Sequence, residues 1–276
     1  MQTDATDNEV LIESLAPSAA MLPLLGALSE ALERLKRGDK TLARAYDWDE
    51  VPVRAFTGML ARFPLALQGW PLGELDPMGT ASGERDLLHH LLADLDIMSE
   101  EDFEERFRSL MEGSHTAAAY RKIAAAPAVA ELLRNEIALG WGGFSMSAVD
   151  PQIEDRIRRR RMYADRHRGV FDWTHVRAWD AAEGAVLLLE AQAGDVLMGR
   201  DPTGYYARVA GEMLARFSSW HEYARALLFA YVWLELEDGI RQAREALERG
   251  EKVLIELLEG PWGDFPWPRI RKSDAD

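Results

Sequence analysis

Residues 171–193 read FDWTHVRAWDAAEGAVLLLEAQA, and residues 217–223 read FSSWHEY. With the apolar run 226–234 they form a segment, 171–235, that holds four of the nine tryptophans of the chain. Its apolar residues recur at the three- and four-residue spacing of an α-helix. The run 226–234 is apolar on every side, so we expect it at the centre of a helical bundle.

Helical spacing also dominates the rest of the chain, where alternating β-branched runs are few. It predicts an all-α fold, an irregular multi-helix bundle with an N-terminal helical extension. The expected helices cover 22–35, 53–63, 84–95, 99–111, 120–139, 151–167, 173–193, 205–217, 220–236 and 240–258. The first has an apolar stripe of Leu22, Leu25, Leu28, Leu32 and Leu35.

Punctuating residues predict where helices begin and end. Ser99, followed by Asp102, and the pair Ser218 and Ser219 before Trp220 are typical of N-caps. Pro64 should end the helix 53–63, and the tail 261–268, with three prolines, should be extended and packed by its aromatic residues. A loop rich in glycine and proline at 64–83 separates an N-terminal helical region, 1–83, from a main domain, 84–268, and a polar tail follows at 269–276.

The charge balance limits the classes of partner. The net charge is −15, and residues 1–150 carry 25 acidic but only 13 basic side chains. Nucleic-acid binding needs a cationic surface and is therefore not expected, whereas attraction to a basic protein is favoured.

Several site types lack their sequence signals. There is no cysteine, so a disulfide, a thiolate metal site and a cysteine nucleophile are excluded. No secretory signal or membrane-length apolar run is present, and we expect a soluble cytoplasmic protein without membrane contact. Nucleophile-elbow, phosphate-loop and paired-histidine zinc motifs are also missing. Asp86, His90 and Asp94 share one helix face, but a solvated face explains them, so no catalytic residue, metal or cofactor is predicted.

The helix 173–193 carries the most informative polar residues. Asp180, Glu183 and Glu190 fall within one narrow arc, beside Trp179 and Leu187. This arc is either the solvent face of a half-buried helix or the place of a buried, paired Asp180. A buried carboxylate needs hydrogen bonds or an ion pair, because removing its water costs several kcal/mol.

Arg177, His175 and His115 are the candidate partners of a buried Asp180, and a structural role is favoured over acid–base chemistry. The candidate pocket residues are His175, Arg177, Trp179, Asp180, Trp220 and Glu222.

A basic run, Arg158, Arg159, Arg160 and Arg161, is the strongest local charge feature. Four consecutive arginines point around the whole helix, so they cannot all face one partner. They either contact an anion, an RNA or an acidic protein, or pair with the acidic N-terminal half of the same chain. RNA binding would require steep salt dependence.

Four short motifs occur in a specific order: IMSEE at 97–101, GSH at 113–115, AWD at 178–180 and FSSWHE at 217–222. In this order they resemble a bacterial family known as domain of unknown function 1266, over about residues 85–236. That family implies no reaction. It often has a basic residue three positions after the aspartate, where this chain has Glu183.

Two functional hypotheses follow. The first is a non-enzymatic protein-binding module that recognises a partner through an acidic surface, of which a toxin-neutralising, immunity-type protein is one version. The alternative is an enzyme or small-ligand binder with a pocket around Trp179 and Asp180.

Overall fold

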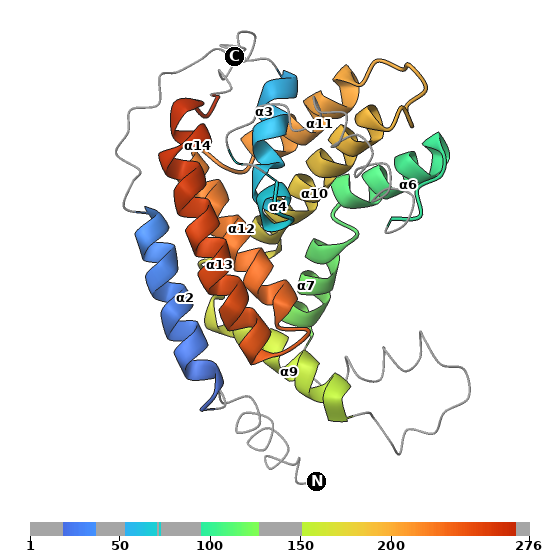
Figure 1. Ribbon diagram of the computed structural model, residues 1–276. Helices are drawn as coiled ribbons and strands as arrows, with labels where there is room; N and C mark the ends of the chain where they lie inside the picture. Colours follow the sequence, from blue (N-terminus) through green and yellow to red (C-terminus); the bar gives the residue numbers. More distant parts are fainter. Residues whose placement is uncertain (1–18, 37–52, 71, 73–94, 127–150, 269–276) are drawn as a thin grey trace, which may run out of the picture.

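The computed structural model describes residues 19–36, 53–70, 72, 95–126 and 151–268. Within these ranges the chain is a bundle of α-helices without strands, which confirms the predicted all-α fold (Figure 1). The helices are α2 (Met21–Lys36), α3 (Val53–Leu60), α4 (Arg62–Leu67), α6 (Glu100–Met111), α7 (Thr116–Ala125), α9 (Pro151–Arg166), α10 (Trp173–Ala193), α11 (Thr203–Leu214), α12 (Trp220–Glu235), α13 (Ile240–Glu259) and α14 (Pro261–Asp264).

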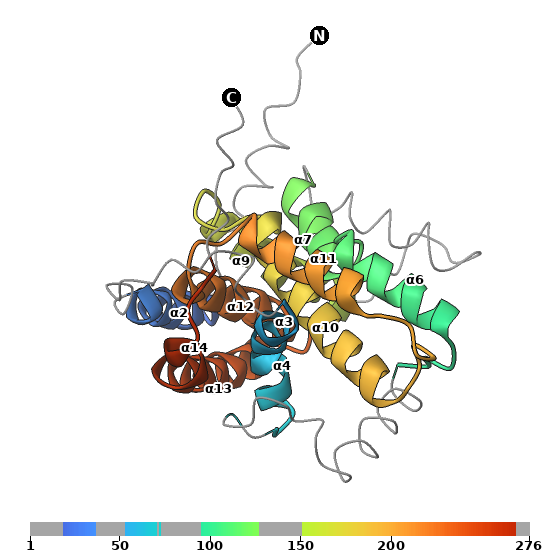
Figure 2. The same ribbon diagram turned by 90° about the horizontal axis from the view of Figure 1, so that it is seen from above.

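Helices α10 and α12 form the centre of the bundle. Helix α12 packs against α13, α10 and α2, and α10 packs against α7, α6, α11, α3 and α4. Figure 2 shows α2, α13 and α14 on one side of this pair and α6 and α7 on the other. Of the apolar run 226–234 only Leu234 is partly exposed, so its predicted central position is confirmed.

The N-caps of the central helices are made by short polar side chains. Asp172 accepts the N–H groups of Thr174 and His175 at the start of α10. Ser219 accepts the N–H of Glu222 in α12, and Ser99 accepts that of Asp102 in α6. The serine caps are those predicted, and each satisfies an N–H that has no partner within its helix.

Two predictions based on proline were wrong. Pro64 does not end a helix but is the third residue of α4, where a missing N–H is tolerated. The tail is also not fully extended, because Pro261 begins the short helix α14 and Trp262 is buried there. Proline stops a helix that approaches it from the N-terminal side, but its fixed φ angle suits a helix that begins there.

Helix α2 presents a slightly different face from the predicted stripe. Leu22 is 56% exposed. The buried face consists of Met21, Leu24, Leu25, Leu28, Ala31, Leu32 and Leu35, and it packs on α12 and α13. Three predicted elements lie partly or mostly outside the described residues: the helix 84–95 except for its last residue, the helix 120–139 beyond residue 126, and most of the loop 64–83.

None of the described helices is both long enough and apolar enough to span a lipid bilayer.

Candidate functional site

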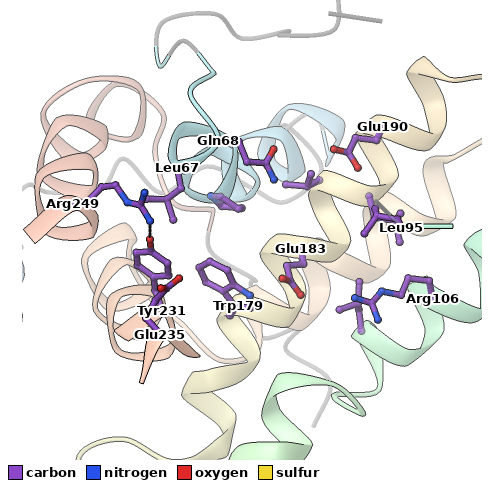
Figure 3. A pocket seen from close by; sticks show the side chains of 14 residues that line it. Leu67, Gln68, Leu95, Arg106, Trp179, Glu183, Glu190, Tyr231, Glu235 and Arg249 are labelled. Atoms are coloured by element: carbon purple, nitrogen blue, oxygen red, sulfur yellow. Dashed lines mark hydrogen bonds between the residues drawn. The ribbon is translucent and has the colours of Figure 1, made fainter. Parts of the chain in front are cut away.

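A pocket of about 300 Å³ opens between α4, α6, α10, α12 and α13 (Figure 3). Its apolar lining consists of Pro64, Leu67, Leu95, Leu110, Trp179, Val186, Leu187 and Tyr231. Its polar lining consists of Gln68, Arg106, Glu183, Glu190, Glu235 and Arg249. An apolar cavity with a few converging polar groups is the usual form of a small-molecule site.

Stacked aromatic rings form one wall of the pocket. Trp179 and Tyr231 lie parallel, with ring centroids 5.4 Å apart and planes 3° apart. Phe63 meets both edge-on, at 6.2 and 5.8 Å. Arg249 donates a hydrogen bond to the Tyr231 hydroxyl and lies 5.6 Å from that ring centroid. These contacts fix the wall, so a ligand would meet preorganised aromatic rings.

Glu183 carries the polar group that stands out most in this pocket. Its side chain is 32% exposed, but its Oε2 atom is buried and accepts no hydrogen bond from the described residues. Burial raises the pKa of Glu183 to about 7, and the negative charge of Asp180 adds to this rise. A hydrogen bond from Trp179 and the positive charge of Arg106 lower the pKa. At neutral pH this carboxyl group is therefore present in both protonation states.

Arg106, on α6, supplies a cationic group beside Glu183. Figure 3 shows Glu183 between Trp179 and Arg106. Arg106 is partly buried, and no hydrogen bond or ion pair joins its guanidinium to any residue in the described ranges. On the opposite side burial raises the pKa of Glu235, and the nearby charge of Arg249 opposes that shift.

Asp180 does not line the pocket. It is fully buried, and its two oxygens accept the N–H groups of Thr116 and Ala117, each at 3.0 Å, in the first turn of α7. Burial raises the pKa of Asp180, while these hydrogen bonds and the charge of His115 lower it. Asp180 is thus a cap supplied by one helix to another, which matches the favoured structural role.

The solvent-face interpretation of the arc was wrong. Asp180 is 0% exposed and Glu190 is 1% exposed. Trp179, Glu183, Leu187 and Glu190 instead line the pocket together. Glu183 and Glu190 were correctly grouped with Trp179 and Leu187, and this part of the arc faces a cavity rather than bulk water. Asp180 instead contacts the start of α7.

One group of side chains in the described residues has a spacing that a metal ion could use. His115, Asp180 and Glu183 each offer a ligand atom, and these atoms lie within 4.8 Å of one another. Both Asp180 oxygens, however, already accept N–H groups at the positive end of α7, and that partial charge opposes a cation. We therefore assign no metal to this group.

The predicted pocket residues at the start of α10 do not reach the pocket. The His175 ring and Asp172 form a capping box. The Arg177 guanidinium donates to the backbone oxygen of Met111 and lies 3.1 Å from Glu212. His175 and Arg177 thus stabilise local structure. Neither forms a hydrogen bond or an ion pair with Asp180, so these two candidate partners of Asp180 are wrong.

The predicted pocket residues at the start of α12 also lie elsewhere. Trp220 stacks on Trp262 with ring centroids 4.8 Å apart, and its ring N–H donates to the backbone oxygen of Phe265 at 2.6 Å. Glu222 accepts the N–H of Ser218 at 2.7 Å. They anchor the C-terminal segment and cap α12 respectively, so of the six predicted pocket residues only Trp179 lines the pocket.

The arginine run in α9 is engaged within the chain. Arg160 lies 2.7 Å from Glu237 and stacks over the Trp233 ring, with its guanidinium 4.3 Å from the centroid. Arg161 binds Asp165 at 2.7 Å. The remaining two pair with residues of the preceding turn, Arg158 with Glu154 and Arg159 with Asp155.

Within the described residues, the ion pairs of these four arginines lie in the C-terminal half. Pairing with the acidic N-terminal half stays a prediction, because much of that half lies outside the described residues. An anion or partner contact through Arg158–Arg161 would have to break these pairs, and it stays a prediction.

The sequence did not identify the residues that complete the pocket. Arg106, Tyr231, Glu235 and Arg249 come from three further helices. No local pattern connects these helices, and only the polar interruptions at positions 183 and 190 of an otherwise apolar helix signalled a cavity.

Comparisons of the chain with protein-family models, with curated proteins and with solved structures found no match. The resemblance to the domain of unknown function 1266 family stays a prediction.

Proposed function

We propose that the chain binds a small organic ligand in the pocket beside Trp179. The observation that carries this proposal is the open cavity itself, in which the side chains of Glu183 and Arg106 lie beside a fixed aromatic wall. A ligand that donates a hydrogen bond to Glu183 could at the same time cover the aromatic wall with its apolar part.

A ligand-observed NMR screen with a fragment library would test this proposal. Leu67→Trp is the informative variant, because Leu67 lines the pocket and a larger ring there would fill it. We expect several fragments to bind the unaltered chain and to lose their signal with this variant. Leu22→Ala, on an exposed position of α2, is the matched control that should keep every hit. If no fragment distinguishes Leu67→Trp from the control, the proposal is wrong.

The acidic face of α6 favours a second candidate function, recognition of a basic protein. Glu100, Glu101, Glu104 and Glu105 surround a shallow hollow together with Arg108 and Arg200. Of these, Glu101 and Glu105 are exposed, so their charge is open to a partner. Exposed charges mainly increase the rate of association and are screened by salt.

Affinity capture from bacterial lysate at low and high salt would test this candidate. We expect a basic protein that binds at low salt and is lost when Glu101→Lys and Glu105→Lys are combined. A partner retained by that double variant would show that α6 is not the interface.

A further inference from the structure

Two opposite charges lie next to each other in the pocket without neutralising each other. Glu183 on α10 and Arg106 on α6 both line the cavity, yet they do not form an ion pair. Each interacts with the other's charge at a distance. Among the residues that the structure describes, neither has another charged partner at contact distance, except for the weak approach of His115 to Glu183 at 3.8 Å. A carboxyl group and a guanidinium left unpaired across a cavity are suited to a ligand that brings the opposite charge to each.

The other charged groups of the pocket are less available to a ligand. Arg249 binds the Tyr231 hydroxyl, and its charge acts on Glu235. Glu190 is only 1% exposed and interacts with neighbouring groups, although its Oε2 atom accepts no hydrogen bond from the described residues. The side of the pocket formed by α6 and α10 therefore presents one cation, Arg106, and one anion, Glu183.

We infer that the ligand is a zwitterion, an α-amino acid with an apolar side chain, whose carboxylate binds Arg106 and whose ammonium group binds Glu183. This inference rests on the proposed function. The two charged groups of an α-amino acid are attached to one carbon atom, so they suit two protein charges that lie close together without touching. Arginine offers two parallel N–H donors to a carboxylate, and an ammonium group offers three donors to the oxygens of Glu183.

The remaining lining fits the side chain of such a ligand. Trp179, Leu187 and Leu110 line the pocket beside the charged pair, and Tyr231 extends the aromatic wall. The volume of about 300 Å³ is at the small end of ligand pockets, which suits an amino acid better than a nucleotide or a peptide.

Four probes that share one phenyl body separate the two charges. L-phenylalanine carries both charges, 2-phenylethylamine only the positive one, 3-phenylpropanoate only the negative one and 2-phenylethanol neither. Dissociation constants would be measured by ligand-observed NMR at pH 7.5. We expect L-phenylalanine to bind at least about tenfold more tightly than each of the other three, because both charge-assisted contacts form only with it.

Two substitutions assign each charge to its residue. Arg106→Gln should raise the dissociation constants of L-phenylalanine and 3-phenylpropanoate at least about fivefold but leave that of 2-phenylethylamine unchanged. Glu183→Gln should weaken L-phenylalanine and 2-phenylethylamine but leave 3-phenylpropanoate unchanged. Thermal unfolding would confirm that both variants fold, and Arg106→Lys should restore part of the carboxylate affinity.

The possible failures are distinguishable. The inference of a zwitterionic ligand is wrong if a probe with one charge or none binds as tightly as L-phenylalanine. It is also wrong if neither substitution changes the affinity for L-phenylalanine. In both cases the pocket remains a ligand site. The same holds if no probe binds while the fragment screen gives hits that Leu67→Trp removes. If the screen also gives no such hit, both the inference and the proposed function are wrong.

Discussion

The Asp180 carboxylate holds the first turn of α7 through the N–H groups of Thr116 and Ala117. Asparagine at this position keeps one acceptor oxygen, but its amide N–H2 would face an N–H donor and the negative charge at the helix start would be lost. We expect Asp180→Asn to lower the free energy of unfolding by roughly 1–3 kcal/mol and to leave ligand affinity at the pocket unchanged.

Urea denaturation and the probe affinities measured on the same variant check this prediction. Glu183→Gln is the control with the opposite pattern, because its side chain lines the pocket and caps no helix. An Asp180→Asn variant of full stability that no longer binds ligand would contradict the capping role.

Glu183 should make stability fall with rising pH. Its pKa is raised from 4.5 to about 7 in the folded chain, so the unfolded chain releases this proton at lower pH than the folded chain. Stability is therefore lost as pH rises from about 4.5 through 7. Glu183→Gln removes this loss, and we expect it to be more stable than the unaltered chain by roughly 1–2 kcal/mol at pH 8 but not at pH 4.5, after allowance for solvent screening.

Urea denaturation at the two pH values would measure the difference. Asp180, Arg106, Trp179 and His115 surround Glu183 and contribute to its electrostatic environment. Burial lowers the pKa of His115. His115→Gln in both backgrounds separates its contribution from that of Glu183. Equal stability of Glu183→Gln and the unaltered chain at pH 8 would show that this carboxyl group is not perturbed.

The contact between α12 and α13 depends on a glycine at the level of the pocket. A Cβ atom on Gly250 would lie 3.0 Å from Leu228 Cδ1 and 3.1 Å from Tyr231 Cδ1, so α13 approaches α12 closely only because this atom is missing. Gly250→Ala should gain roughly 1 kcal/mol of helix propensity but lose about 1–3 kcal/mol to overpacking. We expect a small net loss of stability and weaker ligand binding, because Tyr231 belongs to the aromatic wall.

Gly211→Ala in α11 is the matched control. A Cβ atom there has no neighbour within 4 Å, so the propensity gain should appear alone and raise the melting temperature. Differential scanning calorimetry of the two variants checks both signs. If Gly250→Ala is stabilised as much as Gly211→Ala, the close helix contact does not limit the packing.

At the scale of elements, the sequence was most informative where one helix carries its own signals. The predicted bounds of α10 agree with the structure because its apolar pattern belongs to that helix alone. The arc with Trp179 and Glu183 could be grouped for the same reason. Its neighbours could not be predicted, because the approach of Arg106 from α6 and Tyr231 from α12 depends on how three helices pack.

Charged residues show the same limit. Four arginines in a row suggest a binding surface, but Arg160 lies against the Trp233 ring and Glu237, far along the chain. A charge pattern in the sequence gives the number of charges but not their partners, because the partners depend on how the helices pack.

At the scale of the whole molecule, aromatic residues at the C-terminal end connect segments from both ends of the chain. Trp262 is 1% exposed, stacks on Trp220 of α12 and donates its ring N–H to the backbone oxygen of Met59 in α3 at 2.9 Å. Phe56 of α3 lies 5.5 Å from the Trp220 ring. The N-terminal helix α3 and the C-terminal helix α14 thus share one core, which predicts that they unfold together.

Trp262→Ala tests this coupling. We expect a loss of about 3–5 kcal/mol in the free energy of unfolding, because the substitution opens a large cavity and leaves the Met59 carbonyl without its donor. Circular dichroism reports all helices, whereas tryptophan fluorescence emphasises the aromatic core, and both should give the same lowered midpoint in urea. Leu22→Ala, at an exposed position, should change stability by less than about 0.5 kcal/mol. Separate midpoints for the two signals would mean that α3 and α14 form a unit that unfolds independently of the α10–α12 core.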